Sequence, residues 1–500
     1  MMQPIVSAST SESPSTTAVG SSLDRVLVRG LAWTGAVKWL SQILSWLSTI
    51  VVARLLVPED YGVVAMATAV LGLITLLNEF GLGAAVVALR HLTKEHISQI
   101  HSLASLFGVG GFLLSCAIAI PVGRFFDAPE VTPIMIAMGA GLVVLSMRSV
   151  PSALLEKELR FKLLAFLEGG QSLLAMLTTV LLAWSGAGYW ALVLGGLAGQ
   201  VGATSVICLS HPLTYAKPSW QSLKEAIRFS SHVLISRISW YVSSNSDIFI
   251  AGRVLGQALV GTYSFAGTLA NVPQDKVTAL LSRVMPAFYS TVQHDVGAMR
   301  RYLLLLTEAL ALIVWPMGVG MSLIAHDFIL VVLGDKWSGV IAPLEILACW
   351  AGVRSIFGLI APLLYVTGNS RMAMLNGLYC VATYPVGFWI GSHWGVIGLA
   401  WAWVLVQPLA FIQPYRYVLC ATQLSLWGYL RALWPALSSI VLMAACILGI
   451  QHAIPADWPL MIHLGIEILV GGAAYLMSVQ LFHRRRLVLL LQFIRENRKE

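Results

Sequence analysis

The sequence predicts an all-α integral membrane protein with about 14 transmembrane helices, arranged as two parallel six-helix lobes plus two appended helices. The first observation is composition, because 58% of the 500 residues are hydrophobic and only 11% are charged. A soluble domain carries about 25% charged residues, so this chain is expected to use lipid as its solvent. The other two observations are apolar runs of about 20 residues along nearly the whole chain and a stretch that occurs twice, 199 residues apart.

Each apolar run is long enough to cross a bilayer as a helix, whereas a transmembrane barrel would show alternating segments of about 10 residues, which this sequence lacks. We expect spans near residues 31–53, 62–86, 100–121, 130–147, 163–184, 187–209, 229–251, 260–282, 302–324, 340–361, 372–391, 395–415, 430–452 and 458–480. The expected divisions are a disordered cytoplasmic tail (1–29), a first lobe (30–210), a cytoplasmic linker (211–228), a second lobe (229–420), two extra helices (421–482) and a basic cytoplasmic tail (483–500).

The repeated stretch reads ARLLVPEDYG at residues 53–62 and GRVLGQALVG at residues 252–261. In both copies an arginine (Arg54, Arg253) follows a long apolar run, and a glycine comes eight residues later. We expect each copy to be the end of one membrane helix, a tight turn and the start of the next. Because six expected spans separate the two arginines, both copies face the same side of the membrane, and the lobes are related by an axis along the membrane normal.

The net charge of +8 is best explained by membrane topology. Most of the 31 lysines and arginines lie in alternate connectors and in the two tails, whereas the opposite connectors hold Arg54, Arg124, Arg253 and Lys336. The positive-inside rule therefore predicts that both termini are cytoplasmic. A nucleic-acid partner is not expected, because no basic face is interleaved with aromatic residues.

The chemistry-bearing residues favour a transporter over an enzyme. The six cysteines lie in or beside different spans without a CxxC pair, so we expect packing residues and neither a disulfide framework nor a metal site. No loop is long enough to fold as a separate catalytic domain. We therefore expect no catalytic residue and no cofactor.

Four segments carry a resemblance to a known family. They are ARLLVPEDYGVVAMA (53–67), EFGLGAAVV (79–87), LLEKELRFK (154–162) and SNSDIFIAGRVLG (244–256). Together they resemble polysaccharide flippases, and more narrowly the Wzx/WzxC-type lipopolysaccharide-biosynthesis branch of the multidrug/oligosaccharidyl-lipid/polysaccharide exporter superfamily. The resemblance covers roughly residues 30–420. The second copy of the repeat departs from the first, because it has Gly256-Gln257-Ala258 in place of an acidic Pro-Glu-Asp turn.

The resemblance implies two six-helix lobes around a central cavity that opens alternately to either side of the bacterial cytoplasmic membrane. The implied cargo is an oligosaccharide carried on an undecaprenyl-pyrophosphate-type lipid, moved to the outer leaflet for lipopolysaccharide, capsule or exopolysaccharide biosynthesis. Membrane lipids, and the polymerase and chain-length proteins of the export pathway, are the implied partners. In relatives, spans 1, 2, 7 and 8 line the cavity.

Ionisable residues inside the expected spans point to function, because a charge at the bilayer centre costs about 2.5–3.5 kcal/mol. The substrate-binding candidates are Arg237, Lys38 and Lys276. Arg237 lies about 14 Å along its helix from Arg228. An arginine there could grip a pyrophosphate with two hydrogen bonds, or it could form a structural ion pair between helices. Lys38 could bind substrate or snorkel to the cytoplasmic surface.

Two carboxylates are candidates for coupling transport to a proton or to Na⁺. They are Glu79, toward the cytoplasmic end of its span, and Asp247, toward the outer end of its span. The alternative is that Glu79 caps a helix end and that Asp247 only pairs with a neighbour.

The matched arginines Arg54 and Arg253 are candidates for a structural lock, such as binding carbonyls of the turn, with contact to a lipid phosphate as the alternative. Arg354 and Glu467 lie in spans that are not expected to line the cavity.

Three functions are compared. A flippase would admit a hydrophilic, lipid-linked sugar to a cavity while the lipid tail stays in the bilayer. A drug or cation exporter of the same superfamily would want an anionic cavity, whereas cations are at least as common near the centre of this chain. A membrane polymerase or ligase of lipid-linked sugars is less favoured, because the outer loops are short.

Overall fold

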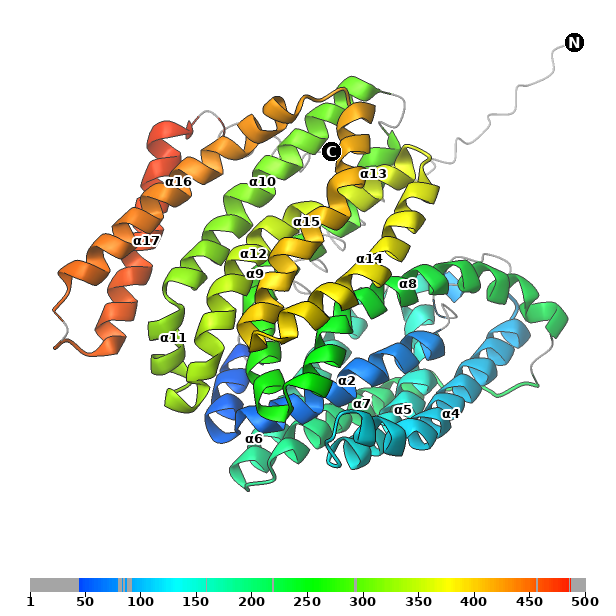
Figure 1. Cartoon of the computed structure of the whole chain (residues 1–500). Helices are drawn as coiled ribbons and strands as arrows, with labels where there is room; N and C mark the ends of the chain where they lie inside the picture. The colour runs from blue at the N-terminus through cyan, green and yellow to red at the C-terminus, as the bar shows by residue number, and fades with distance from the viewer. Residues whose placement is uncertain are drawn as a thin grey trace, which may run out of the picture.

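The computed structural model describes residues 45–79, 83, 86–87, 92–158, 160–217, 220–291, 295–455, 457–484 and 486, and every regular element within them is helical. Ten of the described helices are long and apolar enough to cross a membrane. Figure 1 shows the first lobe in blue and cyan beside the second in green and yellow, with the last two helices at the outer edge of the second lobe. The predicted all-helical architecture is therefore present.

The first lobe consists of a helix at residues 45–55 and five labelled helices. These are α2 (Pro58–Glu79), α4 (Lys94–Phe125), α5 (Val131–Lys157), α6 (Phe161–Trp184) and α7 (Tyr189–Ser210). α4 packs along α5, and α6 packs along α7. The sequence sets the start of α4 through a capping box, in which the Thr93 hydroxyl accepts from the His96 backbone N–H and the His96 ring accepts from the Thr93 N–H.

The second lobe runs from α8 to α15. Its elements are α8 (Trp220–Val254), α9 (Gln257–Thr291), α10 (Val296–Leu323), α11 (Ala325–Val332), the 3₁₀-helix η1 (Asp335–Val340), α12 (Ile341–Phe357), α13 (Ile360–Val366), α14 (Ser370–Ser392) and α15 (Gly395–Ala421). α8 already begins at Trp220, inside the stretch expected to be a linker. α16 (Leu426–Ala453) and α17 (Leu460–Phe482) form the appended pair, and α16 packs on α10.

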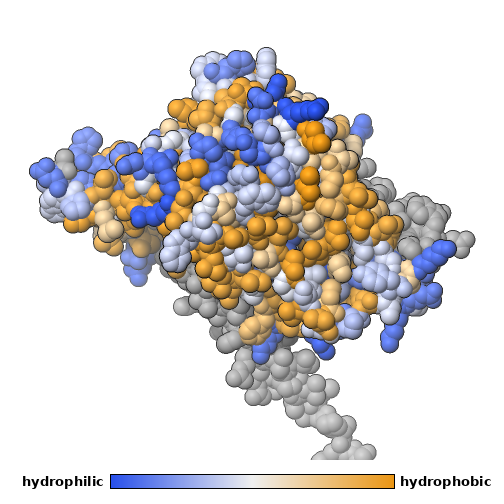
Figure 2. All heavy atoms as spheres, turned by 90° about the horizontal axis from the view of Figure 1, so that it is seen from below, coloured by the Kyte–Doolittle hydropathy of each residue, from blue (hydrophilic) through white to orange (hydrophobic). Residues whose placement is uncertain are grey.

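The outer surface is apolar over a wide area. Figure 2 shows hydrophobic residues over much of the lower and right-hand part of one face, with hydrophilic residues mixed among them in its upper and left-hand part. Large apolar side chains that point outward include Leu113, Leu181, Leu209 and Leu405, and Leu209 is 83% exposed. An apolar surface of this extent suits contact with lipid. α8 and α9 are not among the ten apolar spans. Their polar residues therefore need surroundings other than lipid.

The duplicated stretch forms the same turn twice by different means. α2 begins at Pro58 and α9 begins at Gln257, 199 residues later. Before α2, the Asp60 carboxylate accepts from the Val57 backbone N–H at 3.1 Å. Before α9, Gly256 takes a left-handed conformation with φ of 82°, which glycine adopts without a steric penalty. The loss of the acidic turn in the second copy is thus compensated by glycine.

The two copies meet where α2 and α9 begin, and we call this the closed end. A Cβ atom on Gly62 would overlap the carbonyl oxygen of Gln257, and one on Gly261 would overlap that of Pro58. Each glycine of the repeat therefore fits against the first residue of the opposite helix. This reciprocal contact brings the two lobes together at the repeat itself.

Candidate functional site

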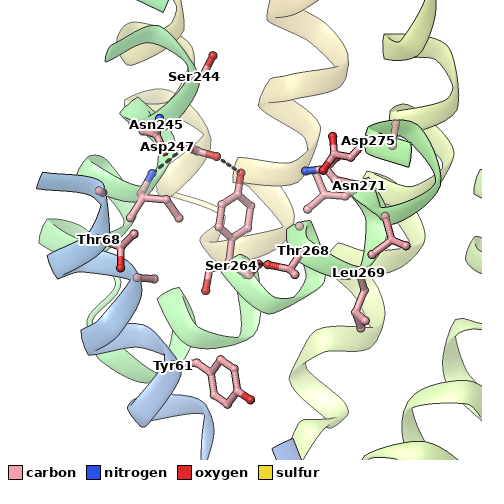
Figure 3. Close-up of a pocket in the computed structure, with 18 of the residues that line it drawn as sticks. Tyr61, Thr68, Ser244, Asn245, Asp247, Ser264, Thr268, Leu269, Asn271 and Asp275 are labelled. Carbon is pink, nitrogen blue, oxygen red and sulfur yellow. Dashed lines mark hydrogen bonds between the residues drawn. The ribbon is translucent and has the colours of Figure 1, made fainter. Parts of the chain in front are cut away.

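A cavity of about 700 Å³ lies between the lobes, in the size range of ligand sites. It is lined by the helix at residues 45–55, α2, α8 and α9, as the resemblance implies, and also by α12 and α15. Figure 3 shows Thr68 of α2 across from residues of α8 and α9. The polar side chains in this lining are Ser45, Thr49, Tyr61, Thr68, Ser244, Asn245, Asp247, Tyr263, Ser264, Thr268, Asn271, Asp275 and Arg354.

Asp247 is the centre of a buried hydrogen-bond network at one wall of the cavity. Its side chain is on α8, and the residue is only 7% exposed. One carboxylate oxygen accepts from the Tyr263 hydroxyl at 2.8 Å and from the Trp403 indole N–H at 3.1 Å, and the other accepts from the Ile248 backbone N–H at 2.8 Å. Because Tyr263 is on α9 and Trp403 on α15, this carboxylate joins three helices of the second lobe.

Arg354 lies in the same wall, on α12. Its guanidinium donates to the Asn271 side-chain oxygen at 2.5 Å and to the Gln274 side-chain oxygen at 3.2 Å, and it lies over the Trp403 ring at 5.4 Å. The carboxylates of Asp247 and Asp275 also act on it electrostatically. The expectation that the span holding Arg354 lies away from the cavity is therefore wrong.

A sequence signal for Arg354 was present on α9. Asn271, Gln274 and Asp275 lie three to four residues apart, so they share one side of a helix. Two amide oxygens and a carboxylate on one side of a membrane helix require a donor from a neighbouring helix. Arg354 supplies that donor.

Of the three substrate-binding candidates, the structure describes the side chain of Arg237 only. Arg237 is exposed and is not part of the described lining. It precedes Ser244 by seven residues, about two helical turns or 10 Å, and so shares the face of α8 that reaches the cavity. The side chains of Lys38, Glu79 and Lys276 lie outside the described residues.

Arg54 connects the first lobe to α11 of the second. Its guanidinium donates to the carbonyl oxygens of Val331 and Val332, at 2.5 and 2.6 Å, where α11 ends. The last carbonyls of a helix lack partners within the helix and favour a positive charge. The repeat-equivalent Arg253 is exposed, and within the described part of the chain we find no hydrogen bond from its side chain.

Two residues of η1 donate hydrogen bonds in the opposite direction, to the C-terminal end of the helix at residues 45–55 and to the residue just after it. The Lys336 ammonium donates to the carbonyl oxygens of Arg54 and Leu56, at 2.7 and 2.6 Å. The Trp337 indole N–H donates to the Ala53 carbonyl oxygen at 2.8 Å. We call Arg54, Lys336 and Trp337 the inter-lobe latch, since each donates across the lobe boundary.

Aromatic packing separates the cavity from the latch. Tyr61 of α2 lines the cavity and packs edge-on against Phe265 and Trp337, with ring centroids 5.1 and 5.3 Å away. Trp337 and Phe265 are fully buried. The cavity is thus sealed at the closed end by side chains from both lobes.

The family model described as "Polysaccharide biosynthesis protein" matches residues 51–342, which run from the closed end through α2 to η1 and into α12. The chain belongs to this polysaccharide biosynthesis protein family. Both the repeat and the latch fall within the matched region.

The sequence matches to two relatives cover most of this chain. The chain is 23% identical over 427 residues to the lipopolysaccharide biosynthesis protein WzxC of Escherichia coli, a match that covers 83% of this chain and 85% of WzxC. It is 23% identical over 404 residues to the succinoglycan biosynthesis transport protein ExoT of Rhizobium meliloti, covering 79% and 80% of the two chains.

Among solved structures, the lipid II flippase MurJ in its inward closed conformation is similar, with a TM-score of 0.74. The match covers 91% of this chain and 99% of MurJ, at 13% sequence identity. This likeness confirms the all-α transporter fold predicted from the sequence.

Proposed function

We propose that this protein is a flippase that moves a lipid-linked oligosaccharide across the bacterial cytoplasmic membrane by alternating access. The observation that supports this most is the polar cavity between two repeat-related lobes, closed at one end by contacts that cross the lobe boundary. The relatives that act in lipopolysaccharide biosynthesis and succinoglycan transport support the same class of cargo. Translocation needs no covalent step, so we assign no catalytic residue.

The proposed orientation places the closed end at the extracytoplasmic face. Both termini are then cytoplasmic, as the distribution of lysine and arginine predicts. In this state the cavity receives cargo from the cytoplasmic side. Opening to the other side would require the latch and the α2–α9 crossing to separate.

We assign the pyrophosphate of the cargo to cations on the cytoplasmic side of the cavity. Arg237 follows Lys38 by 199 residues, the same interval that relates the two copies of the repeat. The duplication therefore gives each lobe one cation at an equivalent position, and Lys276 is a third candidate. Two cations from opposite lobes suit a pyrophosphate, which carries several negative charges.

We keep Glu79 and Asp247 as the proposed ion-coupling residues. Protonation of Asp247 would remove acceptor capacity from a group that receives three hydrogen bonds. That change would loosen the junction of α8, α9 and α15, and so would link proton uptake to the shape of the cavity wall. Proposed partners are membrane lipids and the polymerase and chain-length proteins of the export pathway.

Deleting the gene and locating the lipid-linked oligosaccharide tests this function. We expect undersized intermediates to accumulate on the inner leaflet of the cytoplasmic membrane. Single repeat units that collect on the outer leaflet would instead point to a polymerase and would contradict the flippase proposal.

A further inference from the structure

The two lobes also touch at a second depth, away from the closed end. Tyr241 of α8 donates its hydroxyl to the carbonyl oxygens of Thr68 and Ala69 on α2, at 3.3 and 3.0 Å. The end of its ring packs on Gly72 of α2, where a Cβ atom would overlap the Tyr241 hydroxyl. Thr68 and Ala69 occupy the middle of α2, which runs from Pro58 to Glu79. We call Tyr241 and Gly72 the mid-helix contact.

The mid-helix contact tolerates displacement better than the closed end does. At the closed end, Gly62 and Gly261 meet backbone carbonyls of the opposite helix with no room to spare. The Tyr241 hydroxyl instead shares one proton between two successive carbonyls, and a hydroxyl rotates to suit its acceptor. Successive carbonyls along a helix are separated by a rise of about 1.5 Å. α8 can therefore tilt over α2 while the hydroxyl keeps an acceptor.

The surroundings of the Tyr241 hydroxyl favour keeping this hydrogen bond. Its acceptors lie halfway along α2, a helix that is long and apolar enough to cross the membrane. A hydroxyl without a partner is unfavourable in an apolar environment. The carbonyls of α2 can accept a second hydrogen bond, because a carbonyl oxygen has two lone pairs. We therefore expect the contact to persist when the closed end separates.

The mid-helix contact lies beside the cavity and not across it. On α2 the described lining ends at Ala69, three residues before Gly72, and on α8 it begins at Ser244, three residues after Tyr241. On α9 the lining continues to Asp275. Cargo in the described cavity therefore need not pass between Tyr241 and Gly72.

We propose that Tyr241 and Gly72 form the pivot about which the two lobes rotate. This inference rests on the proposed flippase function, because alternating access requires the lobes to move relative to each other. When the closed end separates, α2 and α8 stay together at the mid-helix contact and change only their angle. Tyr241 is thus a positioning residue that acts on transport without touching the cargo.

The test measures electron–electron distances between two pairs of spin labels on the purified full-length protein, after the six native cysteines are replaced. One pair, at positions 55 and 259, spans the closed end, and these residues are 43% and 41% exposed. The other pair, at positions 77 and 240, lies near the pivot, and these residues are 38% and 69% exposed.

The two pairs should respond differently to a rotation. Leu77 lies five residues from Gly72, about 7.5 Å along α2, whereas Pro58 lies fourteen residues away, about 21 Å. In a rigid rotation each point moves in proportion to its distance from the pivot. The separation of the second pair should therefore change by no more than about a third as much as that of the first.

Gly62→Leu and Gly261→Leu provide the opened closed end, because each side chain would meet a carbonyl of the opposite helix. In both variants we expect a longer distance between positions 55 and 259 and little change between positions 77 and 240. Adding Tyr241→Phe to Gly62→Leu removes the pivot hydroxyl, so the second pair should then separate as well. Adding Tyr379→Phe instead, at an exposed tyrosine of α14, is the matched control and should leave the second pair in place.

Export provides a second measurement. Tyr241→Phe alone should lower surface polymer about threefold at an unchanged level of protein in the membrane, because the lobes lose a hydrogen bond that guides their rotation. Tyr379→Phe should export normally.

The outcomes distinguish the pivot from the proposed function. Equal lengthening of both label pairs in the glycine variants would mean that the lobes separate bodily, which overturns the pivot and leaves the flippase function standing. Should neither glycine variant open the closed end, Tyr241→Phe alone decides, and normal export with unchanged distances between positions 77 and 240 overturns the pivot. Lipid-linked oligosaccharide that still reaches the outer leaflet in cells lacking the protein would overturn the flippase function, whatever the distances are.

Discussion

Single charged residues in this protein are held by specific partners, and Asp247 is the most connected of them. Its carboxylate receives donors from three helices, while Arg354 beside it is shared between two side-chain amide oxygens and an indole ring. A buried polar group in lipid is tolerated only when its hydrogen bonds are made. These two residues therefore set the shape of the second-lobe wall.

Asp247→Asn should destabilise the protein by about 1–3 kcal/mol, because an amide N–H₂ would face groups that donate hydrogen bonds. The expected result is a lower midpoint of thermal unfolding in detergent. Asp457→Asn serves as the control, since Asp457 is exposed in the connector before α17. An unchanged midpoint for Asp247→Asn would mean that the network contributes little to stability.

Arg237→Ala should abolish polymer export while the protein still inserts into the membrane. Hydrogen bonds to charged groups contribute about 1.5–3 kcal/mol, so losing the proposed pyrophosphate contact should lower export at least about tenfold. Surface polymer and membrane-fraction protein are the two measurements. Arg300→Ala, which removes an exposed arginine at the start of α10, is the control. Normal export by Arg237→Ala would remove Arg237 from the mechanism.

At the scale of helices, the start of α2 and the start of α9 form the contact on which the closed end depends. Backbone meets backbone there, because Gly62 and Gly261 have no side chain to hold the helices apart. The latch then adds donors from Arg54, Lys336 and Trp337 at the ends of neighbouring elements. Polar caps on helix ends can break and reform without unfolding either lobe, which suits a gate.

Gly62→Leu should force the closed end apart. Spin labels at positions 55 and 259, which are 43% and 41% exposed, would report the separation by electron–electron distance measurement after the six native cysteines are replaced. We expect a shift to longer distances, and the same shift for Gly261→Leu because its side chain meets the mirrored carbonyl.

Gly110→Leu is the matched control for these variants, because nothing lies within 4 Å of a Cβ atom at that α4 position. If Gly62→Leu left the distances between the labels unchanged, the glycine crossing could not be the contact that holds the closed end together.

At the scale of the whole molecule, the parallel arrangement of the lobes makes a prediction about topology. Cysteines introduced singly at Val57 and Val254, which are 44% and 50% exposed, should both react with a membrane-impermeant thiol reagent added to intact cells. A cysteine at the exposed Glu158 should react only after the membrane is opened. Labelling of Val57 and Val254 from opposite sides would contradict the parallel repeat.

The sequence predicted the helices well because span length depends on local composition, and the paired starts at Pro58 and Gln257 follow from the duplication. The lengths of α8 and α9 were underestimated. At 35 residues each, these helices extend about 52 Å, well beyond a hydrocarbon core of about 30 Å. The first turns of α8 read WQSLKEAIR and carry no apolar signal, and the polar stretch NVPQDK interrupts the apolar pattern of α9 at mid-length.

The site was harder to predict than the helices. Asp247 was identified from its charge alone, whereas the place of Arg354 depends on α12 packing against α9, which no local pattern records. The latch was missed in part for a similar reason. Arg54 was identified, but its acceptors are backbone carbonyls of α11, and every residue type has a carbonyl.

Gly62 packs against the carbonyl of Gln257, the first residue of α9, and Gly261 packs against the carbonyl of Pro58, the first residue of α2. Each half of the chain therefore provides a glycine that makes room for the backbone of the other half. A side chain larger than hydrogen at either position would overlap the main chain of the opposite half. A change in one half would therefore require the backbone of the other half to move. A hybrid that joins one half of this protein to the complementary half of a distant relative should therefore work only when the relative's half also has a glycine at the position equivalent to Gly62 or Gly261.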